Sequence, residues 1–260
     1  MRHEYRTLWL SDIHLGTSAS RAADLLAFLD KVSAEVIYLT GDIVDLERMK
    51  FRTVFPLLHR RVVGRFLQLA KTGTRVIYVP GNHDREFRQL AGVSIGGIDV
   101  ALERSHECGN GQRLLVMHGD CIDSRIRRGR YIEQIGSTAY RWLVEVDVRL
   151  NKLRQRTGNE YSSLSTKIKL RLRSANDYIR RFEETAARYA LNRGFDGVVC
   201  GHIHRPCIRD IEGICYANDG DWVEHRSALA ETGSGQLELL HWSADAVVAA
   251  PRPAPEALAA

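Results

Sequence analysis

Carboxylate and imidazole side chains occur in this chain of 260 residues at spacings that suit metal binding. Asp12 and His14 are separated by one position, so an extended backbone points both side chains to the same side. His202 and His204 repeat this spacing. Oxygen and imidazole ligands without a thiolate suit Mn²⁺, Fe or Zn²⁺. The two pairs therefore predict a metal site.

Three further candidate ligands, Asp42, Asn82 and His118, lie next to glycines, which let the backbone turn sharply near a ligand. Seven candidate ligands are too many for one ion. Two ions about 3.5–4 Å apart, bridged by one carboxylate, can hold an attacking water and stabilise the oxygens of an in-line displacement. Each motif alone is more often an ordinary turn. Their combination favours a two-metal phosphoryl hydrolase.

Short apolar runs precede these residues and are rich in aliphatic and β-branched residues, which predicts buried strands. The runs span residues 7–10, 36–39, 76–79, 114–117 and 197–200. Helical spacing of apolar residues over 21–31 and 53–71 predicts the helices between the first three strands. In an open α/β sheet, ligands collect beyond the carboxyl ends of the strands. The candidate ligands should therefore converge there.

The region from about 123 to 193 has helical patterns and many cations, which predicts a helical cap inserted into one domain over 1–243. We nominate Arg125 and Arg128 in this cap as substrate contacts. The alternative is a basic face that is simply solvated. Short strands are predicted after the cap, and the tail over 244–260, with Pro251, Pro253 and Pro255 among alanines, is predicted to be disordered.

Composition limits the classes of protein. Hydrophobic residues make up 44% and charged residues 27% of the chain, which excludes a disordered chain and a membrane bundle. The amino terminus is charged, and no run is apolar enough to cross a bilayer, so we expect a cytoplasmic protein. The five cysteines include no C-x-x-C pair, which argues against a thiolate zinc site.

Taken in order, the motifs resemble those of the calcineurin-like metallophosphoesterase family. They are Asp12-x-His14, Gly41-Asp42, Gly81-Asn82-His83-Asp84, His118-Gly119-Asp120 and Gly201-His202-Ile203-His204. The resemblance implies an α/β fold with four layers, two mixed β-sheets between helices. It places Asp12, His14, Asp42 and His204 on one metal and Asp42, Asn82, His118 and His202 on the other. It implies that His83 is a proton donor or stabilising cation for the scissile phosphate, oriented by Asp84.

Residues 11–17, residues 218–224 and the position of the cap are similar to the branch that includes UDP-2,3-diacylglucosamine pyrophosphatases of lipid A biosynthesis. That resemblance implies hydrolysis of UDP-2,3-diacylglucosamine to lipid X and UMP with two divalent ions, most simply Mn²⁺. Asn82 and His83 would contact the substrate. The protein would work in the cytoplasm, with peripheral association at the inner membrane.

Other functions stay open because the chain departs from that branch. Its best-studied members resemble each other in having arginine where this chain has His83. Close relatives usually have a tryptophan in the stretch where this chain has Leu46-Glu47-Arg48. A phosphodiesterase, a phosphomonoesterase or a nuclease would use the same metal chemistry, with the basic cap holding nucleic acid phosphates. A non-catalytic scaffold would keep the fold alone. Asp219, Asp221 and Trp222 either support the metal site or form a simple turn.

Overall fold

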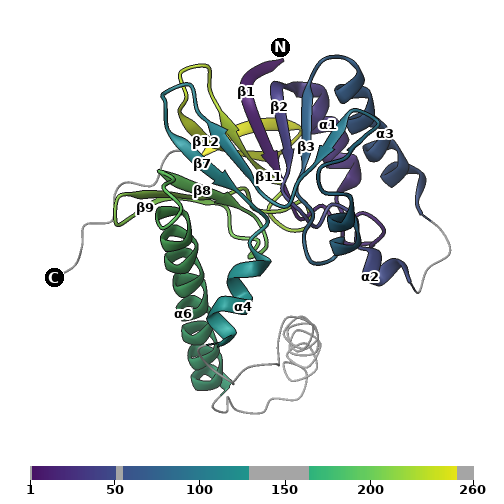
Figure 1. Ribbon diagram of the computed structural model, residues 1–260. Helices are drawn as coiled ribbons and strands as arrows, with labels where there is room; N and C mark the ends of the chain where they lie inside the picture. Colours follow the sequence, from purple (N-terminus) through teal and green to yellow (C-terminus); the bar gives the residue numbers. More distant parts are fainter. Residues whose placement is uncertain (1, 51–54, 129–163, 251–260) are drawn as a thin grey trace, which may run out of the picture. The chain divides into compact units, whose positions relative to one another are not determined.

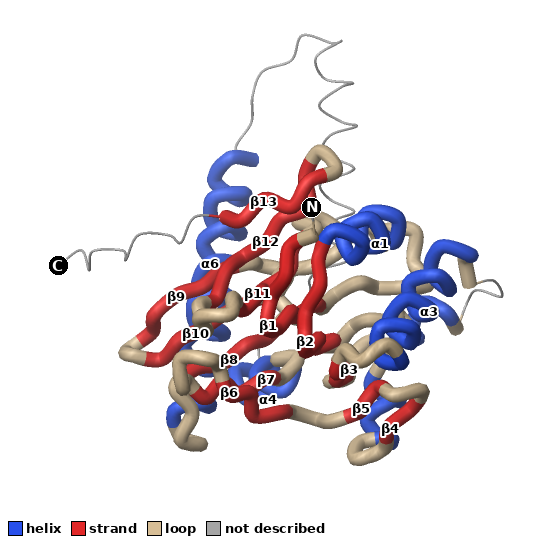
Figure 2. The backbone as a smooth tube through the Cα atoms, turned by 90° about the horizontal axis from the view of Figure 1, so that it is seen from above, coloured by secondary structure: helices blue, strands red, loops and turns tan. Residues whose placement is uncertain are grey.

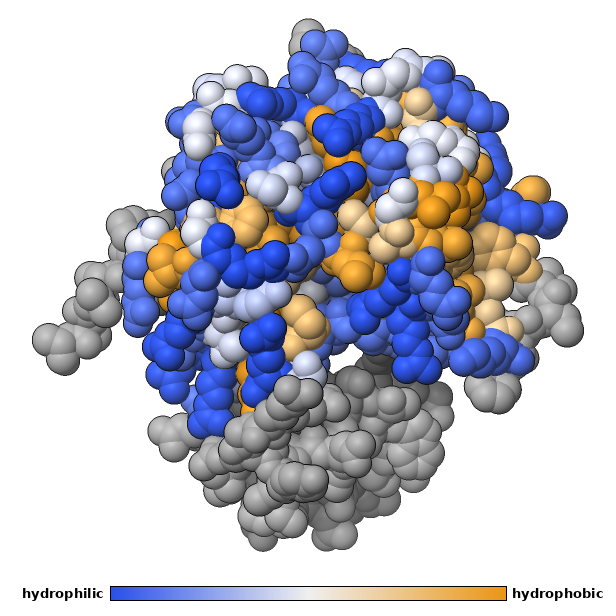
Figure 3. All heavy atoms as spheres, viewed as in Figure 1, coloured by the Kyte–Doolittle hydropathy of each residue, from blue (hydrophilic) through white to orange (hydrophobic). Residues whose placement is uncertain are grey.

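The computed structural model describes residues 2–50, 55–128 and 164–250, with the backbone alone at 127–128, 164–174 and 250. The chain divides into two compact units. The first contains residues 1–122 and 183–260, and the second contains residues 123–182. Among the described residues, no helix has the length and apolar character needed to cross a membrane. Hydrophilic residues cover much of the described surface in Figure 3, with apolar residues grouped among them.

The first unit contains a larger sheet of eight strands (Figure 1). Their spatial order is β13 (Ala246–Ala250), β12 (Leu237–Ser243), β11 (Ser227–Glu231), β1 (His3–Leu10), β2 (Val32–Leu39), β3 (Arg75–Tyr78), β5 (Ile98–Val100) and β4 (Ser94–Ile95). The four strands β1, β2, β3 and β5 run parallel. Because they are parallel, the carboxyl ends of β1, β2 and β3 meet at one edge.

A smaller sheet of five strands belongs to the same unit (Figure 2). Its order is β6 (Arg104–Glu107), β7 (Arg113–Val116), β8 (Gly197–Cys200), β10 (Ile214–Asn218) and β9 (Cys207–Ile211). Strands β7, β8 and β10 are parallel. Their ends therefore add a second set of carboxyl-terminal loops to the site.

The two sheets pack face to face. Successive residues of a strand point to opposite faces, so neighbouring residues of β1 enter two different cores. Trp9 and Tyr38 pack with Val116 and Val199 of the smaller sheet. The neighbouring side chain of Leu8 points the other way, into a core formed with helices α1 (Ala22–Lys31) and α3 (Leu57–Lys71). On the smaller sheet, residues 183–191 of α6 (Leu164–Leu191) complete a fourth layer, with Glu183 beside Cys207 of β9. The predicted α/β sandwich of two mixed sheets is confirmed.

The five strands predicted before the candidate ligands are all present, and most begin earlier than predicted. The pattern missed β4, β5, β6 and β11, which have two to five residues each. None of the four contains the run of aliphatic and β-branched residues on which the other strands were predicted. Two short helices, α2 (Leu46–Met49) and η1 (Arg85–Leu90), were also not predicted.

The predicted disordered tail begins too early. Residues 246–250 form β13, which pairs with β12 through Trp242↔Val247 and Leu240↔Ala249. Residues 251–260 lie outside the described residues. In the predicted cap, α4 (Asp120–Arg128) and α6 are helical as expected, and 129–163 lies outside the described residues. The alanine-containing segment 246–250 forms a strand because β12 supplies its pairing partner.

A buried polar network joins the two sheets around Glu231. Its carboxylate accepts hydrogen bonds from the Thr7 hydroxyl at 2.7 Å and the backbone N–H of Gly109 at 2.8 Å. The His106 Nε2 atom lies 2.9 Å from Glu231 Oε2, and the other ring nitrogen lies 3.3 Å from the Tyr38 hydroxyl. Both oxygens of the Glu231 carboxylate have hydrogen-bond partners, so the cluster has the features of a structural cross-link.

Cys108 lies near His106 and Glu231, and together the three residues could be considered for metal binding. Burial, together with the nearby Glu231 carboxylate, raises the pKa of the Cys108 thiol to about 12. A thiol that stays protonated is a poor metal ligand. We therefore treat this cluster as part of the core.

Replacing Glu231 with glutamine is expected to lower the free energy of unfolding at pH 7 by about 3 kcal/mol, because it unpairs a buried charged network. Burial raises the pKa of Glu231, but hydrogen bonds from His106, Thr7 and Gly109 lower it more. A depressed carboxylate pKa stabilises the fold above the unfolded value of 4.5, and this contribution is lost as the pH falls through the folded value. The difference between the two proteins should therefore shrink below pH 4.5.

Urea denaturation of both proteins from pH 3 to 8 measures this difference, with the exposed Glu107→Gln as the matched control. Equal stability of the Glu231 variant and the parent at pH 7 would show that the network contributes nothing.

Candidate metal centre

The seven candidate ligands all lie in loops that follow strands of the first unit. Asp12 and His14 follow β1, Asp42 follows β2 and Asn82 follows β3, while the histidines His118, His202 and His204 follow β7 and β8 of the smaller sheet. Five of the seven have a positive φ, between 50° and 69°. Non-glycine residues adopt this conformation at a cost of order 1–3 kcal/mol, and such residues concentrate at functional sites. The loops are thus shaped to aim side chains.

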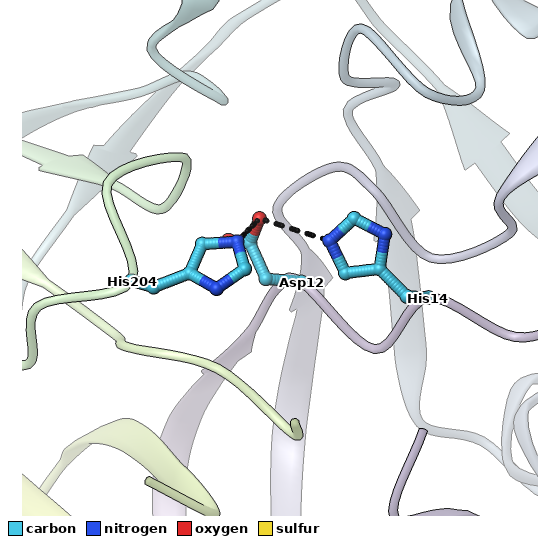
Figure 4. A group of neighbouring side chains, drawn as sticks. All are labelled: Asp12, His14 and His204. Atoms are coloured by element: carbon cyan, nitrogen blue, oxygen red, sulfur yellow. Dashed lines mark ion pairs between the residues drawn. The ribbon is translucent and has the colours of Figure 1, made fainter. Parts of the chain in front are cut away.

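The first group of ligands consists of Asp12, His14 and His204, and Figure 4 shows both rings beside the carboxylate. The Nε2 atom of His204 lies 2.9 Å from Asp12 Oδ1, and that of His14 lies 3.8 Å away. Asp12 is fully buried, yet its Oδ1 atom accepts no hydrogen bond. The short His204 contact therefore brings two ligand atoms toward one point without a hydrogen bond between them.

The second group consists of Asp42, His118 and His202. The Nε2 atom of His118 lies 3.4 Å from Asp42 Oδ2 and 3.2 Å from the Asn82 Oδ1 atom. The Nδ1 atom of His118 donates to the backbone oxygen of Thr40 at 2.8 Å. This bond leaves the lone pair of Nε2 available to a cation.

Asp42 belongs to both groups by distance. Its Oδ2 atom lies 3.4 Å from the Nε2 atom of His118 in its own group. The same Oδ2 atom lies 4.0 Å from the Nε2 atom of His14 in the first group. Its Oδ1 atom accepts the backbone N–H of His83 at 2.8 Å, which fixes the carboxylate. The structure therefore brings all seven predicted residues together, with Asp42 between the two groups.

The residues present fit two divalent cations. The buried Oδ1 atom of Asp12 has no hydrogen-bond donor, as expected for a metal ligand. Burial lowers the pKa of His14, but the nearby Asp12 and Asp45 carboxylates raise it more, to about 9. Such a shift shows that the surrounding carboxylates strongly favour positive charge. The donor set is imidazole and oxygen alone, which suits Mn²⁺, Fe or Zn²⁺.

Close backbone approach also shapes the centre. A Cβ atom added at Gly81 would lie 2.3 Å from Asp42 Oδ1 and 2.7 Å from His118 Nε2. One added at Gly201 would lie 2.2 Å from the Ser11 hydroxyl and 2.5 Å from Asp12 Oδ2. Each glycine in these motifs is therefore needed so that a loop can pass beside the ligands.

A hydrogen-bonded chain supports Asp12 from behind. The Ser11 hydroxyl lies 2.6 Å from both Asp12 Oδ2 and Asp219 Oδ1, but it has one proton to donate. Burial raises the pKa of Asp219 well above its usual range, whereas Asp12 is held below it, because His204 and His14 outweigh the effect of burial there. The higher pKa of Asp219 favours a protonated Asp219 that donates to Ser11, which in turn donates to Asp12. The chain orients Asp12 and leaves Oδ1 facing the centre.

His83 lies beside the first group. Its ring packs edge-on against that of His14, with centroids 4.9 Å apart, and its Nε2 atom lies 4.0 Å from Asp42 Oδ2. Its side chain is 29% exposed, so it can reach a bound molecule. The interaction with Asp45 raises the pKa of His83, and burial opposes this rise. The residue is thus placed to act as a cation or proton donor at the centre.

The role predicted for Asp84 is corrected. Its Oδ1 atom accepts the backbone N–H of Gly81 at 2.6 Å, and its Oδ2 atom accepts that of Ile43 at 2.7 Å. Asp84 therefore ties two ligand loops together. The carboxylate beside the His83 ring is that of Asp45, whose Oδ1 atom lies 3.3 Å from His83 Nδ1.

Asp45 was missed by the sequence analysis, although the spacing Gly41-Asp42-x-x-Asp45 was available to indicate it. Its Oδ2 atom lies 3.3 Å from the Nδ1 atom of His14, so one carboxylate holds both rings. It also accepts the backbone N–H of Arg48 at 2.9 Å, at the start of α2. That bond helps to fix the orientation of the carboxylate.

Replacing Asp45 with asparagine is expected to lower kcat/KM by about 10- to 100-fold, because an amide neither orients nor stabilises two imidazoles as a carboxylate does. Steady-state kinetics of the metal-loaded protein, together with metal titration, measure the change. We expect metal affinity to fall as well, since Asp45 holds His14. Unchanged kinetics and unchanged affinity would show that these contacts are incidental.

The nominated cap residues fall in the second unit. Arg125 is exposed, and the side chain of Arg128 lies outside those described. Within this unit, the Tyr178 hydroxyl donates to the Asp123 carboxylate, which links α4 to α6. Substrate contact by Arg125 and Arg128 stays a prediction.

Comparison with known proteins identifies relatives over most of the chain. The family model described as calcineurin-like phosphoesterase matches residues 5–206. A protein of Aeromonas salmonicida named UDP-2,3-diacylglucosamine hydrolase is 28% identical, covering 89% of this chain and 92% of its own length. The protein of that name from Azotobacter vinelandii is 27% identical, covering 88% and 95%.

Among solved structures, the phosphoesterase Yfce from E. coli matches with 16% identity and a TM-score of 0.47, covering 93% of this chain and 96% of its own. Vacuolar protein sorting 29 from Cryptosporidium parvum has 13% identity and a TM-score of 0.47, covering 94% of each chain. The family match spans the loops that contain all seven candidate ligands. This chain therefore belongs to the calcineurin-like phosphoesterases, a family of hydrolases that use divalent metals.

Proposed function

We propose that this protein is a dinuclear-metal pyrophosphatase that converts UDP-2,3-diacylglucosamine into lipid X and UMP. The observation that carries the chemistry is the position of Asp42 between two buried groups of nitrogen and oxygen ligands. The substrate is supported by the names of relatives that are 27–28% identical over most of the chain. Both the number of ions and the substrate belong to the proposal.

In this proposal, Asp12, His14 and His204 would hold one ion and Asn82, His118 and His202 the other, with Asp42 shared between the two. Divalent cations at such a centre act as Lewis acids on phosphoryl oxygens and lower the pKa of water, and Mn²⁺ suits the mixed donor set. Asp219 and Ser11 keep the Asp12 carboxylate oriented during turnover. The charge of Asp42 and Asp12 balances part of the charge of the ions.

His83 assists departure of the leaving group. Its backbone N–H is held by Asp42, and its ring is flanked by Asp45 and His14, so Nε2 has few orientations available. When the phosphorus–oxygen bond breaks, negative charge develops on the leaving oxygen. The protonated ring stabilises this charge, and it gives up its proton where the leaving oxygen is basic. Cleavage of a diphosphate expels a phosphate monoester, whose weakly basic oxygen needs charge stabilisation more than a proton.

The lipid partner places the reaction at a membrane surface. A substrate with two acyl chains stays in the bilayer, so we propose that the protein associates peripherally with the cytoplasmic face of the inner membrane. Arg125 and Arg128 of the cap would contact phosphates there. Sedimentation with anionic vesicles measures this association.

A substrate screen tests the proposed function. The Mn²⁺-loaded protein is assayed with UDP-2,3-diacylglucosamine, UDP-N-acetylglucosamine, cyclic nucleotides, bis(p-nitrophenyl) phosphate and single-stranded DNA. We expect the highest kcat/KM for the acylated nucleotide sugar, with UMP as a product. Cleavage of the generic diester without cleavage of the acylated nucleotide sugar would refute the proposed lipid substrate. Salt-sensitive cleavage of DNA would favour the nuclease instead.

A further inference from the structure

An aspartate and a histidine in the loop between β10 and β11 form a fixed pair that the metal ligands do not use. Asp221 is completely buried, and its Oδ1 atom accepts the backbone N–H groups of Val223, Glu224 and His225. Its Oδ2 atom lies 2.5 Å from the Nδ1 atom of His225. The first oxygen alone closes the turn. The second oxygen serves the imidazole.

This pair sets both the direction and the tautomer of the His225 ring. Because Nδ1 donates to the carboxylate, Nε2 is the atom that faces outward, and it carries an N–H when the ring is protonated. The side chain is 41% exposed, and in the described part of the chain Nε2 forms no hydrogen bond. A ring that is oriented by a buried carboxylate and still exposed on its far edge is arranged to bind something outside the protein.

The loop is attached to the metal centre. The backbone N–H of Trp222 donates to the backbone oxygen of Asp12 at 3.1 Å, and Asp219, two residues before Asp221, reaches Asp12 through Ser11. The bond with Asp221 raises the pKa of His225, while burial and the nearby His204 ring oppose that rise. The backbone bond of Trp222 and the Asp219–Ser11 chain hold the loop that contains His225 next to the Asp12 group of ligands.

His83 and the loop that contains His225 lie beside different candidate metal-binding residues, His14 and Asp12. His83 packs against His14, whose ring centroid lies 5.5 Å from that of His204. A molecule with one phosphoryl group can use His83 and the centre. A diphosphate has a second phosphoryl group close by, and the Nε2–H of a fixed, protonated imidazole is a suitable partner for its oxygens.

We infer that His225, oriented by Asp221, binds the phosphoryl group of a diphosphate substrate that is not attacked. This inference rests on the proposed function and adds a reason for preferring a diphosphate to a simple phosphate ester. Asp221 is then a positioning residue, because it acts only through the His225 ring.

Equilibrium binding tests the inference without requiring turnover. The Mn²⁺-loaded full chain is titrated calorimetrically with α,β-methylene-UDP, which has a diphosphate that resists cleavage, and with UMP. We expect His225→Ala to weaken binding of α,β-methylene-UDP about tenfold, the effect of losing one charge-assisted hydrogen bond. Binding of UMP should not change. An equal loss for both ligands, or no loss for either, would overturn the inference.

Two further variants make the result specific. His3→Ala removes an exposed histidine at the start of β1, and should leave both affinities unchanged. Asp221→Asn retains an oxygen for the three backbone N–H groups but removes the carboxylate from the ring, so it should also weaken α,β-methylene-UDP selectively. If Asp221→Asn folds, as judged by circular dichroism, and binds both ligands normally, the positioning role is wrong.

Hydrolysis measured in parallel separates this inference from the proposed function. A protein that fails to cleave UDP-2,3-diacylglucosamine but loses diphosphate affinity in His225→Ala refutes the proposed substrate and supports the subsite. A protein that cleaves this substrate but binds α,β-methylene-UDP equally well without His225 refutes the subsite alone.

Discussion

Replacing Asp42 with alanine is expected to lower kcat/KM at least about 1,000-fold, the largest effect of any single substitution in this protein. The Asp42 carboxylate lies near both groups of ligands, 3.4 Å from His118 and 4.0 Å from His14. Its removal leaves the first group with one carboxylate, Asp12, and the second with none. Steady-state kinetics and the metal content of the purified variant measure the two consequences.

Asp30→Ala is the matched control, because it removes a carboxylate from the exposed end of α1 where Asp30 pairs with Arg65. It should leave kcat/KM and metal content unchanged. Because Asp42 also accepts the His83 backbone N–H, circular dichroism is needed to show that the variant folds. A folded Asp42→Ala protein with normal activity would mean that the centre does not work through this carboxylate.

Replacing His83 with alanine is expected to lower kcat by about 100- to 10,000-fold while leaving the metal content unchanged. His83 is not one of the seven candidate ligands, and its ring lies beside Asp45, His14 and the Asp42 carboxylate. Loss of the ring therefore removes leaving-group assistance and spares the ligands. Kinetics and metal analysis on the same preparation separate the two roles.

The size of the loss should depend on the leaving group. A nitrophenolate needs little assistance, so bis(p-nitrophenyl) phosphate should be affected less by His83→Ala than a diester with an alkoxide leaving group. An identical loss for both substrates would contradict proton donation. A loss of metal together with activity would instead make His83 part of the support for the ligands.

The metal centre was predictable because its residues follow strands in a regular order. Parallel strands bring their carboxyl ends to one edge, so Asp12, Asp42 and Asn82 meet although they are far apart in the chain. Which carboxylate faces His83 was not predictable, because Asp84 and Asp45 are both close in sequence to ligands. Only the distances show that Asp84 bonds to backbone groups and that Asp45 lies 3.3 Å from the ring.

Parts of the fold were hidden because tertiary pairing decides them. The sequence of β11, Ser227–Glu231, has two alanines and a buried glutamate, which no strand pattern favours. It becomes a strand because it pairs with β1 on one side and β12 on the other. Glu231 is tolerated there because Thr7 and His106 satisfy its carboxylate.

Electron paramagnetic resonance of the Mn²⁺-saturated protein tests the central claim most directly. If Asp42 bridges two ions, the spectrum at low temperature should be that of an exchange-coupled pair, with two Mn²⁺ bound per chain, and Asp42→Ala should convert it to the spectrum of isolated ions or remove it. A protein that binds one Mn²⁺ per chain and gives only an isolated-ion spectrum at saturation would contradict the account.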